Sequence, residues 1–168
     1  HAGEAADSGG VLMYIPVRLD GKAGDFFTWD ELSRTGTGLK NKPSDFHRTN
    51  LRLVCHQLLD PLRRRLGPIR VTSGYRSLAV NTKIGGSRTS AHMKGLAADI
   101  KSWAGDFTPM DVARAVIELD LKMDQCIVYE GGWCHLGLSI GRERQQFLYK
   151  PTIGRYLPMS PKDIETGT

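Results

Sequence analysis

The chain has 168 residues, of which 40% are hydrophobic and 24% are charged, as in ordinary globular proteins rather than fibrous or disordered ones. No apolar run reaches the roughly 20 residues that a membrane-spanning helix needs, so we expect no membrane span. The formal net charge of +5 and the isoelectric point near 9.2 favour anionic partners in general, without choosing among nucleic acid, an anionic membrane surface and a cell wall.

The length fits one domain with a hydrophobic core of its own. The small, polar start of the chain predicts a flexible tail or an expression-vector remnant at residues 1–10. We expect a single domain over residues 11–160 and a C-terminal tail over residues 161–168.

The first half of the chain predicts two helices and a strand. Residues 26–36 read as a short helix, with Thr28 and Glu31 spaced as a capping box. Apolar residues at helical spacing predict a long helix from Thr49 to Leu66, which Pro61 is expected to kink. Residues 69–73 then read as a strand.

The second half alternates in the same way. Residues 75–86 predict a short helix, residues 96–103 a strand, and residues 108–120 a helix that Thr108 caps. The chain from Gly141 onward reads as a basic loop. Mixed helices and strands with one tight antiparallel connection predict an α+β fold, in which helices pack on a small, largely antiparallel sheet.

That tight connection is a predicted hairpin at residues 124–140, with Gly131-Gly132 as a two-residue turn. Such a turn pairs Glu130 with Trp133, and Val128 with His135. Glu130 and His135 then become diagonal neighbours on one face, roughly 7–8 Å apart. Cys134 points to the other face, whereas Cys126 shares the face of His135 further along the strand. A change of register by one residue would undo this geometry.

Several chemically suggestive residues are better explained without function. Three cysteines without close spacing argue against a disulfide framework. The run Arg63 to Arg65 ends a predicted helix, where cations favour the helix dipole, and no aromatic residues interleave it. We therefore expect no nucleic-acid partner. His47 and His56 lie in or near the long helix and read as surface or internally satisfied residues.

His92 and Asp99 have unusual surroundings. His92 lies in a Ser-rich loop, and Asp99 lies between Ala98 and Ile100 in an apolar strand, where an unpaired charge is costly. With His135 they offer two imidazoles and one carboxylate, a ligand set that suits zinc and leaves a fourth position for water. The alternative from spacing alone is that His92 and Asp99 only hydrogen-bond each other or the backbone.

A resemblance to a known family narrows these alternatives. The segment "SAHMKGLAAD" follows the pattern S-x-H-x-x-G-x-A-x-D and resembles the signature of the zinc D-alanyl-D-alanine carboxypeptidase family, which includes dipeptidases and phage endolysin peptidases. The upstream "VTSGYRS" resembles that family's segment with a substrate-binding arginine, and "DQCIVYEGGWCHLGLS" resembles its last catalytic block. The resemblance covers roughly residues 27–146 and implies a fold like that of hedgehog domains and D-Ala-D-Ala peptidases.

The resemblance also implies roles for single residues. One zinc ion per chain would be held by His92, Asp99 and His135, and Glu130 would be the base that activates its water. Arg76 would bind a substrate carboxylate or stabilise the oxyanion. Further substrate-binding or supporting roles fall to four residues: Ser90, Asp124, Gln125 and Trp133. The spacing departs from the family pattern, because Glu130 precedes His135 by five residues rather than three.

The implied substrate is peptidoglycan, whose stem peptides contain D-amino acids. Which bond is cut, exo- or endopeptidase action, and a phage or bacterial origin all stay open, as does localisation beyond action at the bacterial wall, in the periplasm or after delivery by a phage. We expect a monomer. The competing interpretations are a zinc-bearing binding or structural module of this fold without turnover, and a nucleic-acid binder that uses Arg63 to Arg65.

Overall fold

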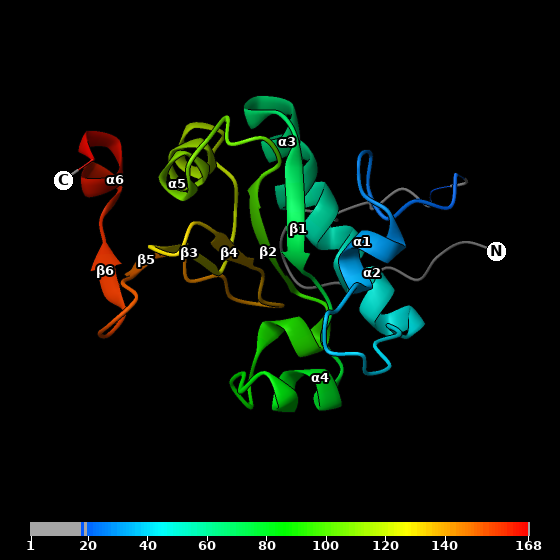
Figure 1. The fold of residues 1–168 in the computed structure, drawn as a ribbon. Coiled ribbons are helices and arrows are strands. Elements are labelled where there is room, and N and C mark those ends of the chain that lie inside the picture. Colours follow the sequence, from blue (N-terminus) through cyan, green and yellow to red (C-terminus); the bar gives the residue numbers. More distant parts are fainter. Residues whose placement is uncertain (1–17, 19, 168) are drawn as a thin grey trace.

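The computed structural model describes residues 18 and 20–167, so the tail expected at residues 1–10 lies outside the described residues (Figure 1). The first elements along the chain are α1 (Trp29–Ser33), α2 (Asp45–Val54), η1 (Cys55–Leu59), α3 (Asp60–Leu66), β1 (Ile69–Ser73), α4 (Leu78–Lys83) and η2 (Ala91–Lys94). The remaining elements are β2 (Ala97–Ser102), α5 (Pro109–Glu118), β3 (Gln125–Tyr129), β4 (Cys134–Gly137), β5 (Gln146–Lys150), β6 (Leu157–Met159) and α6 (Pro161–Thr166).

The six strands form one sheet in the order β1-β2-β4-β3-β5-β6. Every neighbouring pair is antiparallel except β3 and β5, which run parallel. The fold is therefore α+β with a largely antiparallel sheet, as predicted. β2 and β4 are adjacent interior strands, and this pair carries two of the residues singled out above.

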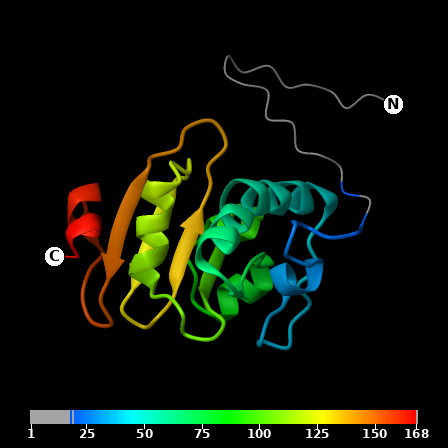
Figure 2. The same cartoon turned by 90° about the horizontal axis from the view of Figure 1, so that it is seen from above.

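One face of the sheet carries the hydrophobic core. The helical stretch from α2 to α3 and helix α5 both contribute to one apolar cluster with the strands, and Figure 2 shows α5 lying across them. On β2, Ala98 and Ile100 belong to this cluster, whereas Asp99 between them does not. The alternation of side chains along a strand thus leaves Asp99 on the opposite face.

The long helix starts earlier than predicted and contains a wider turn. Ser44 and His47 form a capping box at its start, and the helix runs without interruption to Leu66. Directly before Pro61 the helix widens into the π-helical segment η1, where the backbone N–H of Asp60 donates to the carbonyl of Cys55. Proline lacks an N–H, and here the helix accommodates it by a π-turn.

The predicted short helices are confirmed with their caps. Thr28 and Glu31 form the capping box of α1, and Thr108 forms one with Asp111 at the start of α5. α1 ends at Ser33 with Arg34 as its C-cap, before the expected stop at Gly36. No described helix is both long and apolar enough to cross a membrane.

The prediction for the C-terminal part is wrong. The chain from Gly141, read as a loop, forms β5, β6 and α6, and Ile164 of the expected tail is fully buried in the core. β5 is added to the sheet by parallel pairing with β3, a non-local contact that no turn signal announces. Pro158 lies in β6, an edge strand, where a missing N–H is tolerated.

Candidate metal centre

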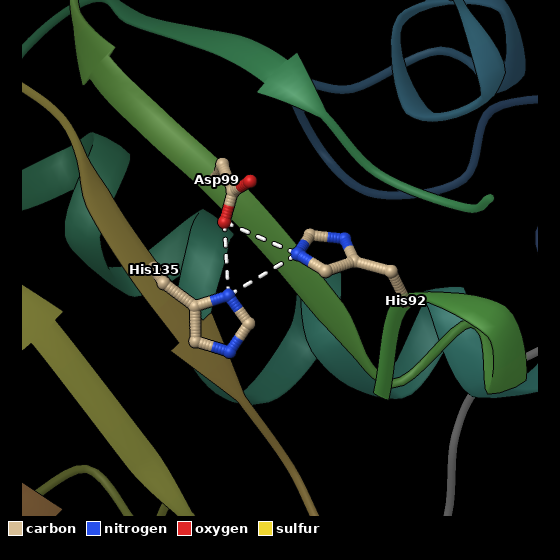
Figure 3. A group of neighbouring side chains, drawn as sticks. All are labelled: His92, Asp99 and His135. Atoms are coloured by element: carbon tan, nitrogen blue, oxygen red, sulfur yellow. Dashed lines mark hydrogen bonds and ion pairs between the residues drawn. The ribbon is translucent and has the colours of Figure 1, made fainter. Parts of the chain in front are cut away.

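Three side chains converge on the open face of the sheet. His92 Nε2 and Asp99 Oδ1 are 3.1 Å apart, His135 Nδ1 and Asp99 Oδ1 are 2.9 Å apart, and the two imidazole nitrogens are 3.1 Å apart. Figure 3 shows these three atoms facing a common point. They form a group able to hold a metal ion, and the prediction that these residues come together is confirmed.

Strand pairing brings Asp99 and His135 together. Asp99 of β2 lies directly opposite His135 of β4 in the antiparallel register. Directly opposed residues have Cβ atoms only about 4.5–5.5 Å apart, so one atom can bridge their side chains. Two of the candidate ligands thus lie on interior strands of the sheet, each of which has a neighbour on either side.

A network of backbone contacts fixes His92. The hydroxyl of Ser90 caps η2 and accepts from the backbone N–H of His92 at 3.3 Å. The carbonyl of His92 accepts from the backbone N–H of Arg76. Nδ1 of the imidazole lies 2.7 Å from the carbonyl of Gly74. Since a carbonyl only accepts, Nδ1 is the protonated nitrogen and Nε2 presents a lone pair to Asp99 and His135.

Gly95 lets the chain turn from η2 into β2. Its φ of +70° is left-handed, and a Cβ built on it would lie 2.6 Å from the carbonyl oxygen of His47 in α2. A residue with a side chain would meet both the backbone strain and the clash. The glycine of the sequence pattern therefore has a physical reason: it brings His92 back towards the start of β2.

These donor atoms fit a zinc ion. A tetrahedral zinc with nitrogen and oxygen ligands at about 2.0–2.1 Å separates its ligand atoms by about 3.3 Å, close to the spacings found. Burial lowers the pKa of His92, which favours the neutral imidazole that a metal needs. Burial alone would raise the pKa of Asp99, but the two histidines beside its carboxylate bring the pKa well below its ordinary value. The centre therefore presents an ionised carboxylate and lone pairs at short range.

Arg76 contacts the carboxylate of Asp99 from the side away from the two histidines. Its Nη2 donates to Asp99 Oδ2 at 2.7 Å, and its Nε donates to the hydroxyl of Ser73 at 2.8 Å. The guanidinium thus holds Oδ2 while Oδ1 faces the centre. Ligating carboxylates are commonly oriented by such hydrogen bonds. The predicted contact of Arg76 with substrate stays a prediction.

A polar cleft of about 730 Å³ opens over the three side chains. Ser90, Asp124 and Gln125 line it as well, so the structure brings these predicted residues to the site. Asp124 forms an ion pair with Arg144, whose Nη2 lies 2.7 Å from Asp124 Oδ2. That pair lowers the pKa of Asp124 below its ordinary value. Cations on the cleft wall are Arg76, Lys94 and Arg144.

The predicted hairpin register is wrong by one residue. Val128 pairs with Cys134, and Ile127 pairs with His135. The connection is longer than two residues, because the backbone N–H of Tyr129 donates to the carbonyl of Trp133 and closes the loop. The face that carries His135 therefore contains Ile127 and Tyr129 instead of Val128 and Glu130.

Glu130 lies in the turn, and its side chain contacts the loop after β5 rather than the cleft. Its carboxylate accepts from the backbone N–H of Thr152 at 2.6 Å, and this bond lowers the pKa of Glu130. Its own N–H donates to the carbonyl of Lys150. Glu130 is not among the described residues that line the cleft, and neither is Trp133. The geometry that favoured Glu130 as the base is thus absent from the described site, and the residue tethers the loop after β5.

The structure also tests the predictions for Cys126 and His47. Cys126 does not share the face of His135; it lies in the core, with its sulfur 3.5 Å from that of Cys134. His47 caps α2 through Ser44 and packs against the ring of Tyr75, which is a structural role.

Sequence reasoning missed two tyrosines of the cleft. Tyr129 and Tyr156 both line it, and their hydroxyl oxygens are 3.3 Å apart. Tyr129 was assigned to the wrong face by the register error. Tyr156 follows β5 in a stretch without helical or alternating pattern, so no local signal placed it at the site.

Comparison with known families gives one match. A family model described as Peptidase M15 matches residues 26–136, which is more than half of the chain. The matched segment contains His92 and Asp99 and ends one residue after His135. No curated protein matches the chain.

Proposed function

The chain belongs to the peptidase M15 family, and on this premise we propose that it is a zinc-dependent peptidase that hydrolyses peptide bonds in peptidoglycan stem peptides. The observation that carries the proposal is the triangle of His92, Asp99 and His135, whose ligand atoms lie 2.9–3.1 Å apart at the bottom of a polar cleft. Three protein ligands are the number found in catalytic rather than structural zinc sites.

The residues of the metal centre have different roles in the proposed reaction. A zinc ion held by His92, Asp99 and His135 would supply a Lewis acid, which can polarise a carbonyl group and lower the pKa of water. His92 and His135 contribute neutral nitrogens, and Asp99 contributes the negative charge. Arg76 keeps the Asp99 carboxylate oriented through Oδ2, which fixes the oxygen that faces the centre.

A base must take the proton of the attacking water, and among the described carboxylates and imidazoles that line the cleft only Asp124 is not assigned to the metal. Asp99 is engaged as a ligand, and Glu130 is bonded to Thr152 outside the cleft. Asp124 lies on the cleft wall, and Arg144 holds it ionised and oriented through bonds to both carboxylate oxygens. We therefore assign the proton-accepting role to Asp124 in place of Glu130.

The cleft chemistry supports an anionic peptide as substrate. Arg76 and Arg144 line it as ion pairs with Asp99 and Asp124, which leaves the positive charge of Lys94 in excess on the described wall, and the chain carries a net charge of +5. Stem peptides bear several free carboxylates, which suit guanidinium and ammonium partners. The pocket walls also offer hydroxyls and an amide, from Ser90 and Gln125, that can bind peptide groups.

The test is digestion of purified peptidoglycan followed by mass spectrometry of the released fragments. We expect new peptide termini from the zinc-loaded wild type, and none after chelation or with His92→Ala. The masses of the new termini name the bond that is cut. Zinc binding without fragments from any wall preparation would contradict the proposal and indicate a metal-bearing binding module.

A further inference from the structure

The corrected register changes which side chain stands beside His135. Ile127 is directly opposite His135, and Tyr129 is the next residue of β3 on the same face. Diagonal neighbours on adjacent antiparallel strands have backbones about 7–8 Å apart, within reach of aromatic side chains. Tyr129 thus occupies the place that sequence reasoning gave to Glu130, and it lines the cleft.

Packing fixes the ring of Tyr129. It stacks on Trp133 with ring centroids 4.5 Å apart and planes inclined by 12°. The two residues are also joined through the backbone, since the N–H of Tyr129 donates to the carbonyl of Trp133 at 2.9 Å. A stacked ring of this kind cannot rotate freely, so the phenol oxygen is held in one direction.

The hydroxyl of Tyr129 has a partner that leaves its proton available. Tyr156 Oη lies 3.3 Å from Tyr129 Oη. A hydroxyl donates one hydrogen bond and accepts up to two, so a Tyr156 hydroxyl that donates leaves the O–H of Tyr129 for the cleft. The loop that carries Tyr156 is tethered by Glu130 through Thr152 and by Lys150, whose Nζ donates to the carbonyl of Gly154.

The phenol stays protonated. Burial and the nearby charge of Asp99 raise the pKa of Tyr129 above its ordinary value. It is therefore a neutral donor throughout the neutral range. Arg76, the other donor considered for this role, uses Nε and Nη2 for Ser73 and Asp99, so its orientation is set by those bonds.

We propose that the Tyr129 hydroxyl donates a hydrogen bond to the scissile carbonyl oxygen as negative charge builds up on it during attack. Trp133 and Tyr156 are positioning residues that hold this donor. The inference rests on the proposed peptidase function and adds a catalytic residue to it. A donor aimed at developing charge lowers the barrier more than it strengthens substrate binding.

The first test compares Tyr129→Phe with Tyr149→Phe in zinc-loaded protein, using the stem peptide identified by the digestion experiment. Tyr149 lies on β5 and packs against the core on the opposite face, so it is a matched control. We expect Tyr129→Phe to lower kcat by about 100-fold with little change in KM. Tyr149→Phe should keep wild-type kinetics, and Tyr156→Phe should fall between the two.

A second readout is independent of turnover. A phosphinate dipeptide analogue, which presents a tetrahedral anionic oxygen, is titrated into each zinc-loaded variant by calorimetry, with zinc content measured in parallel. We expect Tyr129→Phe to retain its zinc and bind the phosphinate at least tenfold more weakly than wild type.

The outcomes separate the two proposals. Equal kcat and equal phosphinate affinity in Tyr129→Phe and wild type would overturn the role of Tyr129 and leave the peptidase function standing. A wild type that cleaves no stem peptide would refute the peptidase function, and phosphinate binding would then decide on Tyr129 alone. Absence of phosphinate binding by the wild type itself would overturn the inference as well.

Discussion

The two walls of the cleft are built in different ways. The inner wall consists of His92, Asp99 and His135. These residues come from η2 and the interior strands β2 and β4, within the segment that matches the family. The outer wall includes Arg144 and Tyr156, and both residues lie beyond residue 136, where that match ends.

The two walls differ in the contacts that fix their geometry. The inner wall is set by direct strand opposition and by backbone bonds to His92, so its geometry is tied to the core of the sheet. The outer wall depends on the parallel pairing of β3 with β5 and on a loop tethered by Glu130. We infer that the inner wall holds the metal, whereas the outer wall contacts the substrate.

The sharpest test of the inner wall is Asp99→Asn. The amide keeps the size of the side chain but removes the negative charge between the two histidines. We expect zinc affinity to fall by more than about 100-fold, because loss of mere supporting groups already lowers affinity 10- to 100-fold. Competition against a chromophoric chelator measures it. Asp106→Asn, at an exposed position, is the control, and unchanged affinity in Asp99→Asn would disprove the ligand assignment.

The comparison between Asp124 and Glu130 tests the outer wall. We expect Asp124→Asn to lower kcat by about 10²- to 10⁴-fold, the usual contribution of a positioned acid or base. Glu130→Gln should stay within about twofold to threefold, because the amide oxygen of glutamine can still accept the bond from Thr152. Kinetics on one stem peptide at equal zinc loading provides the measurement. The reverse order of effects would restore Glu130 as the base.

Helix α6 lies beyond residue 136, like the named residues of the outer wall, and its contribution to the stability of the domain can be measured. Ile164 is fully buried in α6, whereas Ile153 is 91% exposed in the loop before β6. We expect Ile164→Ala to lower the free energy of unfolding by about 2–5 kcal/mol, and Ile153→Ala to leave it nearly unchanged. Urea unfolding of both variants decides, and equal midpoints would mean that α6 contributes nothing to the stability of the domain.

Two glycines with the same φ of +70° give the finest comparison. A Cβ on Gly85 meets nothing within 4 Å, whereas a Cβ on Gly95 meets the carbonyl of His47. We expect Gly85→Ala to cost about 1 kcal/mol from backbone strain alone. Gly95→Ala should cost about 1–3 kcal/mol more, because the clash forces a shift in the packed backbone. Equal unfolding free energies for the two variants would contradict the close approach of η2 to α2.

The sequence predicted what depends on local patterns. Capping pairs predicted α1 and α5, short runs between turn signals predicted β1 and β2, and the motifs around His92 and His135 indicated the three metal-binding candidates that the structure brings together. These features depend on side chains close in sequence or on one strongly patterned strand pair.

The predictions of the hairpin register and of the C-terminal part were wrong because both depend on contacts between segments that local patterns do not determine. A two-residue turn and the observed longer one are both compatible with Gly131-Gly132, yet they put different residues beside His135. The strand β5 has only a parallel partner within the hairpin and no connecting turn, so its 146–150 segment resembled a loop. Both wrong predictions concern segments that form or support the outer wall.

The three cysteines give this comparison an internal reporter. Cys55 is buried in the π-helical segment η1 of the long helix, and Cys126 of β3 and Cys134 of β4 are buried as a contacting pair. A buried thiol reacts with an aromatic disulfide reagent only when its surroundings open. The labelling rate of Cys55 therefore reports opening of the helical layer, and that of the pair reports opening of the sheet. The wild-type chain thus has a thiol reporter in each layer. We expect zinc to lower the labelling rate of Cys126 and Cys134 more than that of Cys55.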